Sequence, residues 1–230
     1  MPKTILITGA NGNLGAAVVK KFLDEGYKVI AVDHSGTHLG FAASHDNFEL
    51  RAVDLANEQA VGDFIKEILE LYGRVDGALL LAGGFAMGDV AATDGDALRK
   101  MITLNFETAY FVARPLFRHM QDNGYGRLVF MGARPALKPE QGKGAVAYAM
   151  SKSLLFQLAD LLNATAKGKN VVASVVAPST IDTEPNRKSM PDADPATWVR
   201  PEQIADILEF ICSEKGDVIR EPVYKVYNNS

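Results

Sequence analysis

The sequence predicts an α/β protein with a doubly wound parallel sheet of about seven strands and helices on both faces. Segments with strand character alternate with segments of helical periodicity along all 230 residues. This alternation is typical of repeated strand–helix–strand units. Several strand segments are continuous apolar runs, as expected for strands buried on both faces of a sheet. No linker rich in Pro, Ser or Gly divides the chain, so residues 1–230 are predicted to fold as one domain.

The individual elements can be placed in order along the chain. Apolar, β-branched runs predict strands at Thr4–Thr8, Lys28–Asp33, Phe48–Val53, Val75–Ala82, Arg127–Met131, Val171–Val176 and Val223–Tyr227. Apolar residues that recur every three to four positions predict helices at Leu14–Glu25, Glu58–Leu71, Ala97–Asp122, Val146–Ala166 and Glu202–Ser213. Glycine commonly ends a helix, and Gly26, Gly73 and Gly124 follow the first three of these segments.

Residues 184–198 interrupt the alternation of predicted strands and helices. The stretch is polar, contains Pro185, Pro191 and Pro195, and lies between a predicted strand and the last predicted helix. Ligands of open parallel sheets bind beyond the carboxyl ends of the strands, and irregular segments at that edge often carry function. We therefore expect residues 184–198 to form a lid over a substrate.

The first predicted strand leads into a glycine-rich turn, Thr8-Gly9-Ala10-Asn11-Gly12-Asn13-Leu14-Gly15. A turn between a strand and a helix can bind a pyrophosphate, because free backbone N–H groups and the positive end of the helix dipole point at it. Glycines let the backbone approach such a ligand. A plain tight turn is the alternative. We expect a dinucleotide in a Rossmann-like fold, bound by Gly9, Asn11, Gly12, Asn13, Leu14 and Gly15.

Asp33 ends the second predicted strand, about twenty residues after the glycine turn. A carboxylate at this place accepts hydrogen bonds from the adenosine ribose hydroxyls and repels the 2′-phosphate of NADP(H). The glycine turn contains no Arg or Lys that would offset this repulsion. The sequence therefore favours NAD(H) over NADP(H) as the cofactor.

Tyr148 and Lys152 lie one helical turn apart in the helix predicted at Val146–Ala166. Residues four apart share a face of a helix, so the phenol and the ammonium point into the same site. A close positive charge favours the phenolate and lowers the pKa of a tyrosine from its ordinary value of ~10. The pair therefore predicts a general acid/base in which Lys152 lowers the pKa of Tyr148.

Further motifs accompany the glycine turn, Asp33 and the Tyr148–Lys152 pair: Asp54-Leu55, Ala82-Gly83-Gly84 and Asn105. In this order and spacing they resemble the short-chain dehydrogenase/reductase family over essentially the whole chain. The resemblance implies hydride transfer between a nicotinamide and a small organic substrate, with Lys152 also on the nicotinamide ribose and Asn105 holding a water of a proton relay. It adds cofactor contacts at Asp54, Leu55, Ala82, Gly83, Gly84, Pro178 and Thr183.

The chain departs from the family's pattern at two places. The Gly12-Asn13 spacing in the turn resembles the family's longer, extended members, although this chain is too short for their usual substrate domain. The family's catalytic serine falls on Ala133, and a methyl group cannot hydrogen-bond a substrate carbonyl. Ser151 and Ser153 lie near Tyr148 in sequence, but their helix positions face away from it, so neither is expected to replace the lost hydroxyl.

Loss of the serine points to one branch of the family, the dihydropteridine reductases. Three segments resemble that branch, namely Leu81–Phe85, Gly132–Leu137, and Asp182–Asp194 with Trp198. Thr8 and Asn105 instead follow the broader family. The branch implies a quinonoid dihydropteridine as a possible substrate. We expect substrate contacts from Ala133, Arg187, Lys188 and Trp198, with an apolar anchor as the alternative role of Trp198.

Two other functions remain open at this point. One is an ordinary carbonyl or alcohol oxidoreductase that works without the serine. The other is a non-catalytic nucleotide-sensing protein on the same fold, although such a protein does not need Tyr148 and Lys152 together. The resemblance also suggests a homodimer or homotetramer built on the helices at Ala97–Asp122 and Val146–Ala166.

Composition narrows the range of partners. The 24 basic and 28 acidic residues give a net charge of −4 without a basic stripe, which disfavours nucleic acid and membrane partners. The longest apolar stretch, near Leu79–Ala86, is too short to span a bilayer, and the first strand begins too early for a signal peptide. The single Cys212 fits a reducing compartment. We expect a cytoplasmic protein that acts on a small molecule.

Neither the histidines nor the methionines suggest a site. His38, His45 and His119 have no companions at metal-ligand spacing, so no metal is expected. Methionine more often fills gaps in a core than carries function. We therefore interpret five of them as packing residues: Met87, Met101, Met120, Met131 and Met150.

Overall fold

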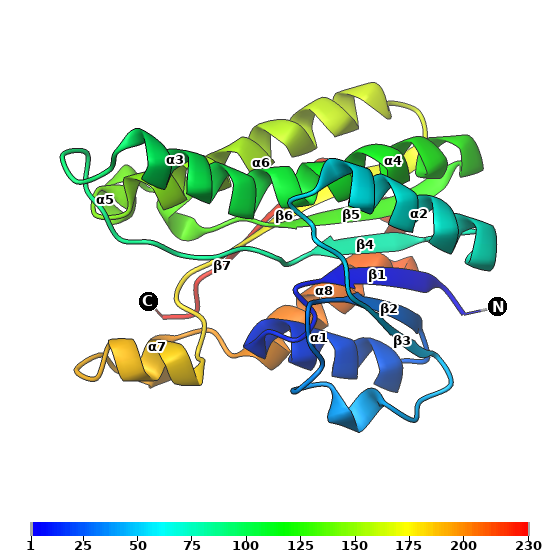
Figure 1. Ribbon diagram of the computed structural model, residues 1–230, viewed down its shortest axis with the longest axis horizontal. Coiled ribbons are helices and arrows are strands. Elements are labelled where there is room, and N and C mark those ends of the chain that lie inside the picture. Colours follow the sequence, from blue (N-terminus) through cyan, green and yellow to red (C-terminus); the bar gives the residue numbers. More distant parts are fainter. Residues whose placement is uncertain (1, 230) are drawn as a thin grey trace.

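A computed structural model describes residues 2–229 and contains one seven-stranded parallel sheet in the order β3-β2-β1-β4-β5-β6-β7 (Figure 1). The predicted fold class is therefore confirmed. The strands are β1 (Thr4–Thr8), β2 (Lys28–Val32), β3 (Phe48–Arg51), β4 (Gly77–Leu80), β5 (Tyr125–Met131), β6 (Asn170–Pro178) and β7 (Val223–Val226).

Helices cover the sheet on both faces (Figure 1). Figure 1 shows α2, α4 and α6 above the sheet and α1 and α8 below it. The helices are α1 (Asn13–Asp24), α2 (Glu58–Tyr72), α3 (Gly95–Ile102), α4 (Thr108–Asn123), α5 (Pro139–Gly142), α6 (Val146–Thr165), α7 (Glu184–Ser189) and α8 (Pro201–Cys212).

Two hydrophobic cores lie on opposite faces of the sheet. Successive strand residues point to opposite faces, and β1 shows this clearly, because Leu6 joins the core under α2, α4 and α6 while Ile5 and Ile7 join the core over α1 and α8. All five residues of β1 are buried. The continuous apolar strand runs of the sequence thus follow from burial on both faces.

The order of the strands reverses at β1. The chain runs outward through β2 and β3 and then returns to β4, which pairs with the other side of β1. Such a switch point is where open α/β sheets bind ligands, beyond the carboxyl ends of the strands. The glycine turn after β1 and the segment Ala82–Gly84 after β4 meet at this place.

The long helix expected at Ala97–Asp122 is divided. A π-helical turn, Thr103–Glu107, separates α3 from α4. A π turn inserts one residue into the helical ladder, and such insertions are frequent at functional sites. Periodicity alone did not show it, because one extra residue shifts the apolar pattern by less than a third of a turn.

The expected irregular lid contains regular structure. Residues 184–189 form α7, which begins after the N-cap Thr183, and Pro195–Thr197 form a short 3-10 helix after the N-cap Asp194. Each helix has a proline in its first turn, where the missing N–H makes no difference to the helix. Pro185 and Pro195 thus lie in the first turns of helices, whereas Pro191 lies in the turn between them. Among the described residues, no helix has the length and apolarity needed to cross a membrane.

Candidate active site

The glycine turn after β1 has a backbone that only glycine allows at two positions. Gly9 has φ of +64°, and a Cβ there would lie 2.9 Å from the backbone of Ala82. A Cβ on Gly15 would lie 2.1 Å from the Gly9 carbonyl oxygen. These contacts let α1 start directly against β1 and β4.

The N-terminus of α1 fits the phosphates of a dinucleotide. Its N-cap is Gly12, which provides no side-chain cap, and its first turn contains no acidic residue. The first N–H groups of a helix lack partners inside the helix, so those of Asn13, Leu14 and Gly15 are available to an anion. The turn thus has the donors and the close backbone approach that a pyrophosphate requires.

Asn11 joins the glycine turn to the segment after β2. Its backbone N–H donates to the Asp33 carboxylate at 3.0 Å. Its side-chain amide donates to Ser35 at 2.8 Å and to Thr37 at 3.2 Å, and its Oδ1 accepts from the backbone N–H of His38 at 2.7 Å. Asp33 is half-buried and also accepts from the N–H of residue 34. Asn11 therefore organises the surroundings of Asp33.

The segment Ala82–Gly84 after β4 is held by two side chains. The N–H of Ala82 donates to Thr8 Oγ1 at 3.2 Å, and the N–H of Gly84 donates to Asn105 Oδ1 at 2.9 Å. A Cβ on Gly83 would lie 2.5 Å from Asn105 Oδ1 and 3.2 Å from Lys152 Nζ. Gly83 is therefore the point where the predicted cofactor segment and the predicted catalytic residues come together.

Asn105 lies on the π-helical turn and is only 1% exposed. Its Nδ2 donates to Ser151 Oγ at 3.0 Å, and Ser151 Oγ donates to the backbone carbonyl of Tyr148 at 2.8 Å. Ser151 was expected to face away from Tyr148, and its buried hydroxyl contacts Asn105. It does not stand in for the serine missing at Ala133, but it belongs to the site.

Lys152 is buried and donates from Nζ to the backbone carbonyl of Met131 at 2.7 Å. Burial lowers the pKa of Lys152 to about 8. Burial also raises the pKa of Tyr148 to about 12. We expected the ammonium to lower the pKa of Tyr148, and the direction is the opposite, because desolvation of the phenolate dominates while the ammonium is engaged by Met131.

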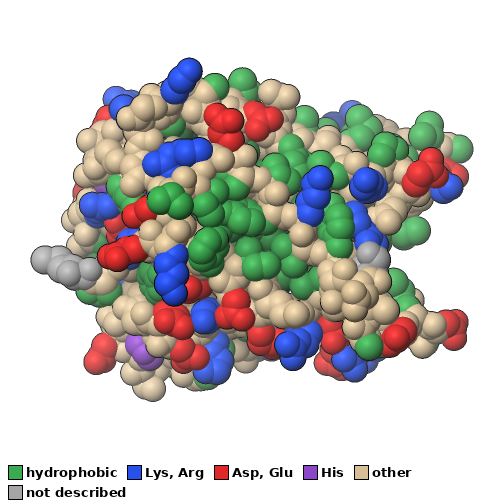
Figure 2. Space-filling view, turned by 180° about the vertical axis from the view of Figure 1, so that it is seen from behind, with side chains coloured by type: hydrophobic (Ala, Val, Ile, Leu, Met, Phe, Trp, Pro, Cys, Tyr) green, Lys and Arg blue, Asp and Glu red, His purple; other side chains and the backbone are tan. Residues whose placement is uncertain are grey.

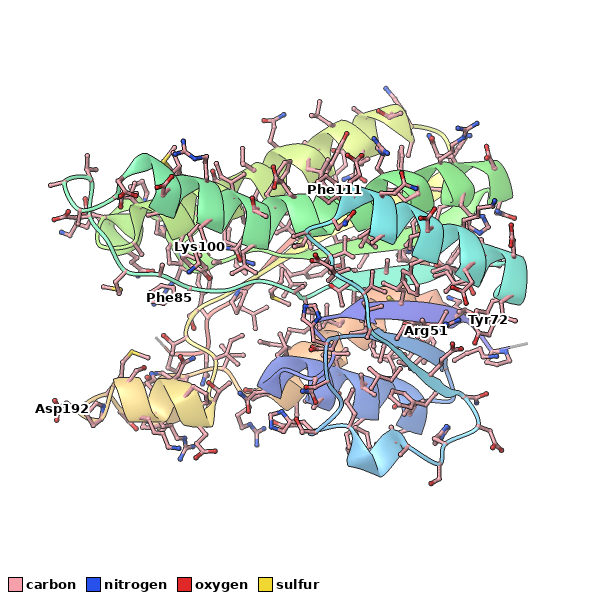
Figure 3. All side chains as sticks on the ribbon, viewed as in Figure 1. Arg51, Tyr72, Phe85, Lys100, Phe111 and Asp192 are labelled. Carbon is pink, nitrogen blue, oxygen red and sulfur yellow. The ribbon has the colours of Figure 1, made fainter. Side chains whose placement is uncertain are left out.

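Tyr148 contacts an aromatic residue that sequence reasoning missed. Its ring meets that of Phe85 edge to face, with 4.9 Å between the ring centroids. Phe85 is 61% exposed and lies on the long segment between β4 and α3 (Figure 3). Phe85 therefore presents much of its ring to solvent directly beside Tyr148. The sequence signals for Phe85 were its position after a Gly-Gly pair and at the end of the segment Leu81–Phe85.

Ala133 follows β5 and is 2% exposed, in an extended backbone conformation. The next residue, Arg134, begins a short 3-10 helix and places its guanidinium 5.2 Å from the centre of the Tyr227 ring. The position aligned with the family's serine is therefore a buried methyl group at the carboxyl edge of the sheet.

The remaining predicted cofactor residues have structural partners. Asp54 accepts from the N–H of Ala56 at 3.0 Å in the turn before α2, and Leu55 is buried in the core. Pro178 is the last residue of β6. Thr183 caps α7 by accepting from the N–H of Asn186 at 3.4 Å. All of them lie at or after the carboxyl ends of strands, which is the edge where the cofactor is expected.

The three predicted lid contacts lie in different environments. Arg187 forms two hydrogen bonds to Asp182, at 2.6 and 2.8 Å, and lowers the pKa of that carboxyl. Lys188 pairs with Glu184 on the exposed face of α7. Trp198 is 5% exposed, and its carbonyl accepts from Asn228 at 2.8 Å. This packing favours the anchor role for Trp198.

Two of the methionines interpreted as packing residues are on the surface. Met87 is 74% exposed and Met150 is 52% exposed, whereas the other three are buried. Met87 lies two residues after Phe85, next to Gly88, whose N–H donates to the carbonyl of Gly144 at 2.9 Å. The interpretation was wrong for Met87 and Met150, because composition cannot distinguish a buried thioether from an exposed one.

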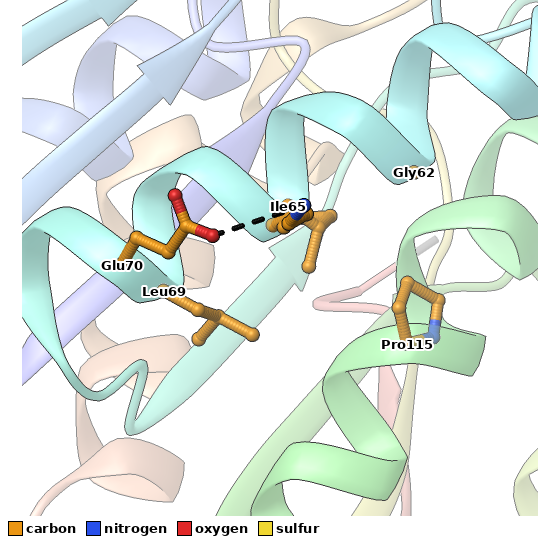
Figure 4. A pocket seen from close by; sticks show the side chains of 6 residues that line it. Gly62, Ile65, Leu69, Glu70 and Pro115 are labelled. Atoms are coloured by element: carbon orange, nitrogen blue, oxygen red, sulfur yellow. Dashed lines mark ion pairs between the residues drawn. The ribbon is translucent and has the colours of Figure 1, made fainter.

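Two surface hollows lie away from this site. A groove of about 390 Å³ runs between α2 and α4 (Figure 4), with a Lys66–Glu70 ion pair of 3.9 Å at its rim. The other hollow, of about 380 Å³, is lined by residues near Lys3 and Tyr27. Neither is lined by a residue of the glycine turn or by Tyr148 or Lys152.

Comparison with known proteins agrees with this geometry. A family model described as short chain dehydrogenase matches residues 3–194. The chain therefore belongs to the short-chain dehydrogenase family. It is 29% identical over 233 residues to the 3-oxoacyl-[acyl-carrier-protein] reductase MabA of Mycobacterium tuberculosis strain H37Rv, covering 97% of this chain and 91% of the relative.

Solved structures share the fold. ElxO with NADP bound superposes with a TM-score of 0.91 at 23% identity, covering 98% of this chain and 97% of that one. 4-Hydroxyisoleucine dehydrogenase complexed with NADH gives 0.88 at 22% identity, with the same coverage of both chains. The family makes this chain an oxidoreductase that uses a nicotinamide cofactor.

Proposed function

We propose that the protein is an NAD(H)-dependent reductase of a small conjugated substrate, with Tyr148 as the general acid. NADH would supply the hydride. The glycine turn would hold the phosphates, Asp33 the adenosine ribose, and Lys152 the nicotinamide ribose. At neutral pH the raised pKa of Tyr148 keeps its phenol protonated, so Tyr148 can donate a proton to the reduced substrate. This protonation state suits the role of a general acid.

The preference for NAD(H) rests on Asp33. Its carboxylate lies next to the glycine turn, where it accepts from the backbone N–H of Asn11. A 2′-phosphate placed here would meet the negative charge of Asp33.

Replacing Asp33 is expected to narrow the difference between the two cofactors. Asp33→Ser removes the carboxylate that would repel the 2′-phosphate, so affinity for NADPH should rise and affinity for NADH should fall. Catalytic efficiency with each cofactor measures the change. Asp46→Ser, on an exposed turn, provides the control. A wild type with clearly better efficiency for NADPH would contradict the assignment.

The substrate class follows from one observation, the buried methyl group of Ala133. Reduction of a simple ketone develops negative charge on one oxygen, and a hydroxyl donor at this position would stabilise it. One such donor contributes about 2.7 to 4 kcal/mol in comparable oxyanion sites. A conjugated nitrogen heterocycle spreads the charge over its ring and needs a proton more than an oxyanion donor. A quinonoid dihydropteridine has this chemistry, and the exposed ring of Phe85 beside Tyr148 suits a planar substrate.

The two classes of substrate are therefore expected to react at different rates. The wild type is expected to reduce quinonoid dihydropterin, or a similar conjugated imine, much faster than simple ketones. Ala133→Ser should leave the imine rate unchanged, because that substrate does not use the added hydroxyl. Steady-state rates of NADH oxidation on both substrate classes test this. If the wild type reduced ketones at rates typical of dedicated ketone reductases and showed no activity on the pterin, the pterin substrate would be refuted. The family assignment would remain intact.

An ordinary carbonyl reductase is the second candidate. The relative MabA is named for reduction of 3-oxoacyl groups, and such a function requires the site to work without a hydroxyl at Ala133. For this candidate, Ala133→Ser is expected to raise the rate on ketones. The wild-type rates on ketones and on conjugated imines therefore separate the two candidates.

We propose residues 184–198 as a substrate-facing lid. Figure 1 shows α7 at the edge of the molecule where α5 and the segment before α3 also lie. Arg187, with its side chain 58% exposed, is the proposed contact. Arg187→Ala should raise the KM for substrate more than the KM for NADH, whereas Lys20→Ala in the surface pair on α1 should change neither. Equal effects on both KM values would show that residues 184–198 only pack against the fold and do not contact substrate.

We also propose that the chain forms a homodimer or homotetramer through α4 and α6. The face of α6 exposes Met150, Leu154 and Leu161, which lie on one stripe at helical spacing. Figure 2 shows further apolar side chains gathered in the middle of the rear face. Exposed apolar surface of this kind is typical of assembly interfaces. The mass in solution, compared with 24.8 kDa for one chain, checks this proposal.

The cytoplasm is the proposed compartment. Its support is the composition and the single buried Cys212, which needs no oxidising environment. Fractionation of cells that express the protein tests the assignment.

A further inference from the structure

A serine on the catalytic helix connects three parts of the site. Ser151 is fully buried on α6. Its hydroxyl donates to the carbonyl of Tyr148 at 2.8 Å and accepts from Asn105 Nδ2 at 3.0 Å. A hydroxyl has one proton to donate, and in Ser151 that proton is used within the helix. Its oxygen is therefore available as an acceptor for Asn105.

Asn105 depends on Ser151 for its orientation. The other contact of Nδ2 is the sulfur of Met101 at 3.8 Å, and a thioether is a weak acceptor. With Nδ2 fixed on Ser151, Oδ1 faces the cofactor segment and accepts from the N–H of Gly84 at 2.9 Å. The two ends of one amide thus link α6 to the segment after β4.

The local backbone leaves Asn105 little freedom to find another arrangement. Asn105 lies on the π-helical turn and is 1% exposed. Gly83 passes so close that a Cβ would lie 2.5 Å from Asn105 Oδ1. Without Ser151 the Nδ2 group would be a buried donor with only a weak acceptor, and rotation of the amide would deprive Gly84 of its acceptor.

We infer that Ser151 is a positioning residue, which holds the Asn105 amide and through it keeps the segment Ala82–Gly84 in place for the cofactor. This inference rests on the proposed function, because it assumes that Ala82–Gly84 lines the cofactor. Ser151 itself contacts neither cofactor nor substrate in this account. Its effect is transmitted through Asn105 alone.

The chain offers a matched control in Ser153. Ser153 lies two residues further along α6, is exposed, and donates to the carbonyl of Met150 at 2.7 Å. Ser151→Ala and Ser153→Ala therefore remove the same kind of hydroxyl-to-helix hydrogen bond. Only the first also removes an acceptor for Asn105.

The test measures NADH affinity by fluorescence titration and NADH oxidation by steady-state kinetics. Ser151→Ala is expected to weaken NADH binding by a factor of roughly 5 to 30, the effect of one buried hydrogen bond. The kcat should fall as well, while the KM for substrate stays within about twofold. Ser153→Ala should match the wild type. NADH affinity and kcat of Ser151→Ala equal to those of Ser153→Ala would overturn the inference.

Two further variants separate positioning from packing. Ser151→Thr keeps the hydroxyl and is expected to recover most of the NADH affinity. If Ser151→Ala does not fold, Ser151→Cys takes its place, because the cysteine sulfur is only a weak acceptor for Asn105. In an Asn105→Ala background, Ser151→Ala should cause no further loss of NADH affinity, because the two residues act in series. Additive losses would contradict the inference. Since NADH titration needs no substrate, a wild type that binds NADH without turnover would refute the proposed function and still leave this comparison decisive.

Discussion

Tyr148→Phe is expected to lower turnover by roughly 10² to 10⁴ while leaving NADH affinity unchanged. The substitution removes one hydroxyl and keeps the ring, which packs edge to face on Phe85 with 4.9 Å between centroids. The lost group is the proton donor, and the pKa of about 12 keeps it protonated at neutral pH. The cofactor contacts lie on other elements and should not change.

The control for this variant is Tyr110→Phe. Tyr110 stacks on Phe106 with 5.9 Å between ring centroids, and that contact does not depend on its hydroxyl. Turnover of Tyr110→Phe should match the wild type. Near-full activity of Tyr148→Phe on the true substrate would show that another group supplies the proton.

Lys152→Met is expected to damage both cofactor binding and turnover. Lys152 is 5% exposed, and its ammonium donates to the Met131 carbonyl at 2.7 Å. Hydrogen bonds to a charged group contribute about 1.5 to 3 kcal/mol, so loss of the ribose contact should weaken NADH binding roughly 10- to 100-fold. Titration with NADH and steady-state rates measure the two effects separately. Unchanged NADH affinity would show that Lys152 does not contact the nicotinamide ribose.

The same substitution should change how stability depends on pH. The pKa of Lys152 is about 8 in the folded protein and 10.5 for an ordinary lysine. Between these values the unfolded state binds more protons, so this residue makes the free energy of unfolding rise with pH. Lys152→Met should lack that contribution between pH 8 and 10.5, whereas Lys20→Met on the surface of α1 should retain it. Denaturant unfolding across this range shows the difference.

The strands were predictable because a strand that is buried on both faces has a continuous run of apolar residues. β1 was predicted residue for residue, since a run of apolar residues at Ile5–Ile7 cannot be solvated on either side. The π-helical turn was not predictable, because its extra residue changes hydrogen bonding without changing composition. α7 was hidden for a related reason, since Pro185 is compatible with either a loop or the first turn of a helix.

The geometry of the candidate site was predictable where it depends only on residues that are close in the sequence. The glycine turn requires Gly9 at positive φ, and a helix places Tyr148 and Lys152 on one face without help from the rest of the fold. Ser151 was missed because its partner Asn105 is distant in sequence. The direction of the Tyr148 pKa shift was missed because it depends on burial. Burial is not visible before the strands are assembled.

The central claim is hydride transfer from NADH with Tyr148 as the proton donor. Oxidation of NADH, followed by its absorbance for wild type and Tyr148→Phe on quinonoid dihydropterin and a carbonyl panel in parallel, tests it most directly. The account predicts that the wild type consumes NADH on a conjugated substrate and that Tyr148→Phe binds NADH equally well without comparable turnover. A wild type that binds NADH but oxidises it on no member of the panel would contradict the claim and favour a nucleotide-sensing protein.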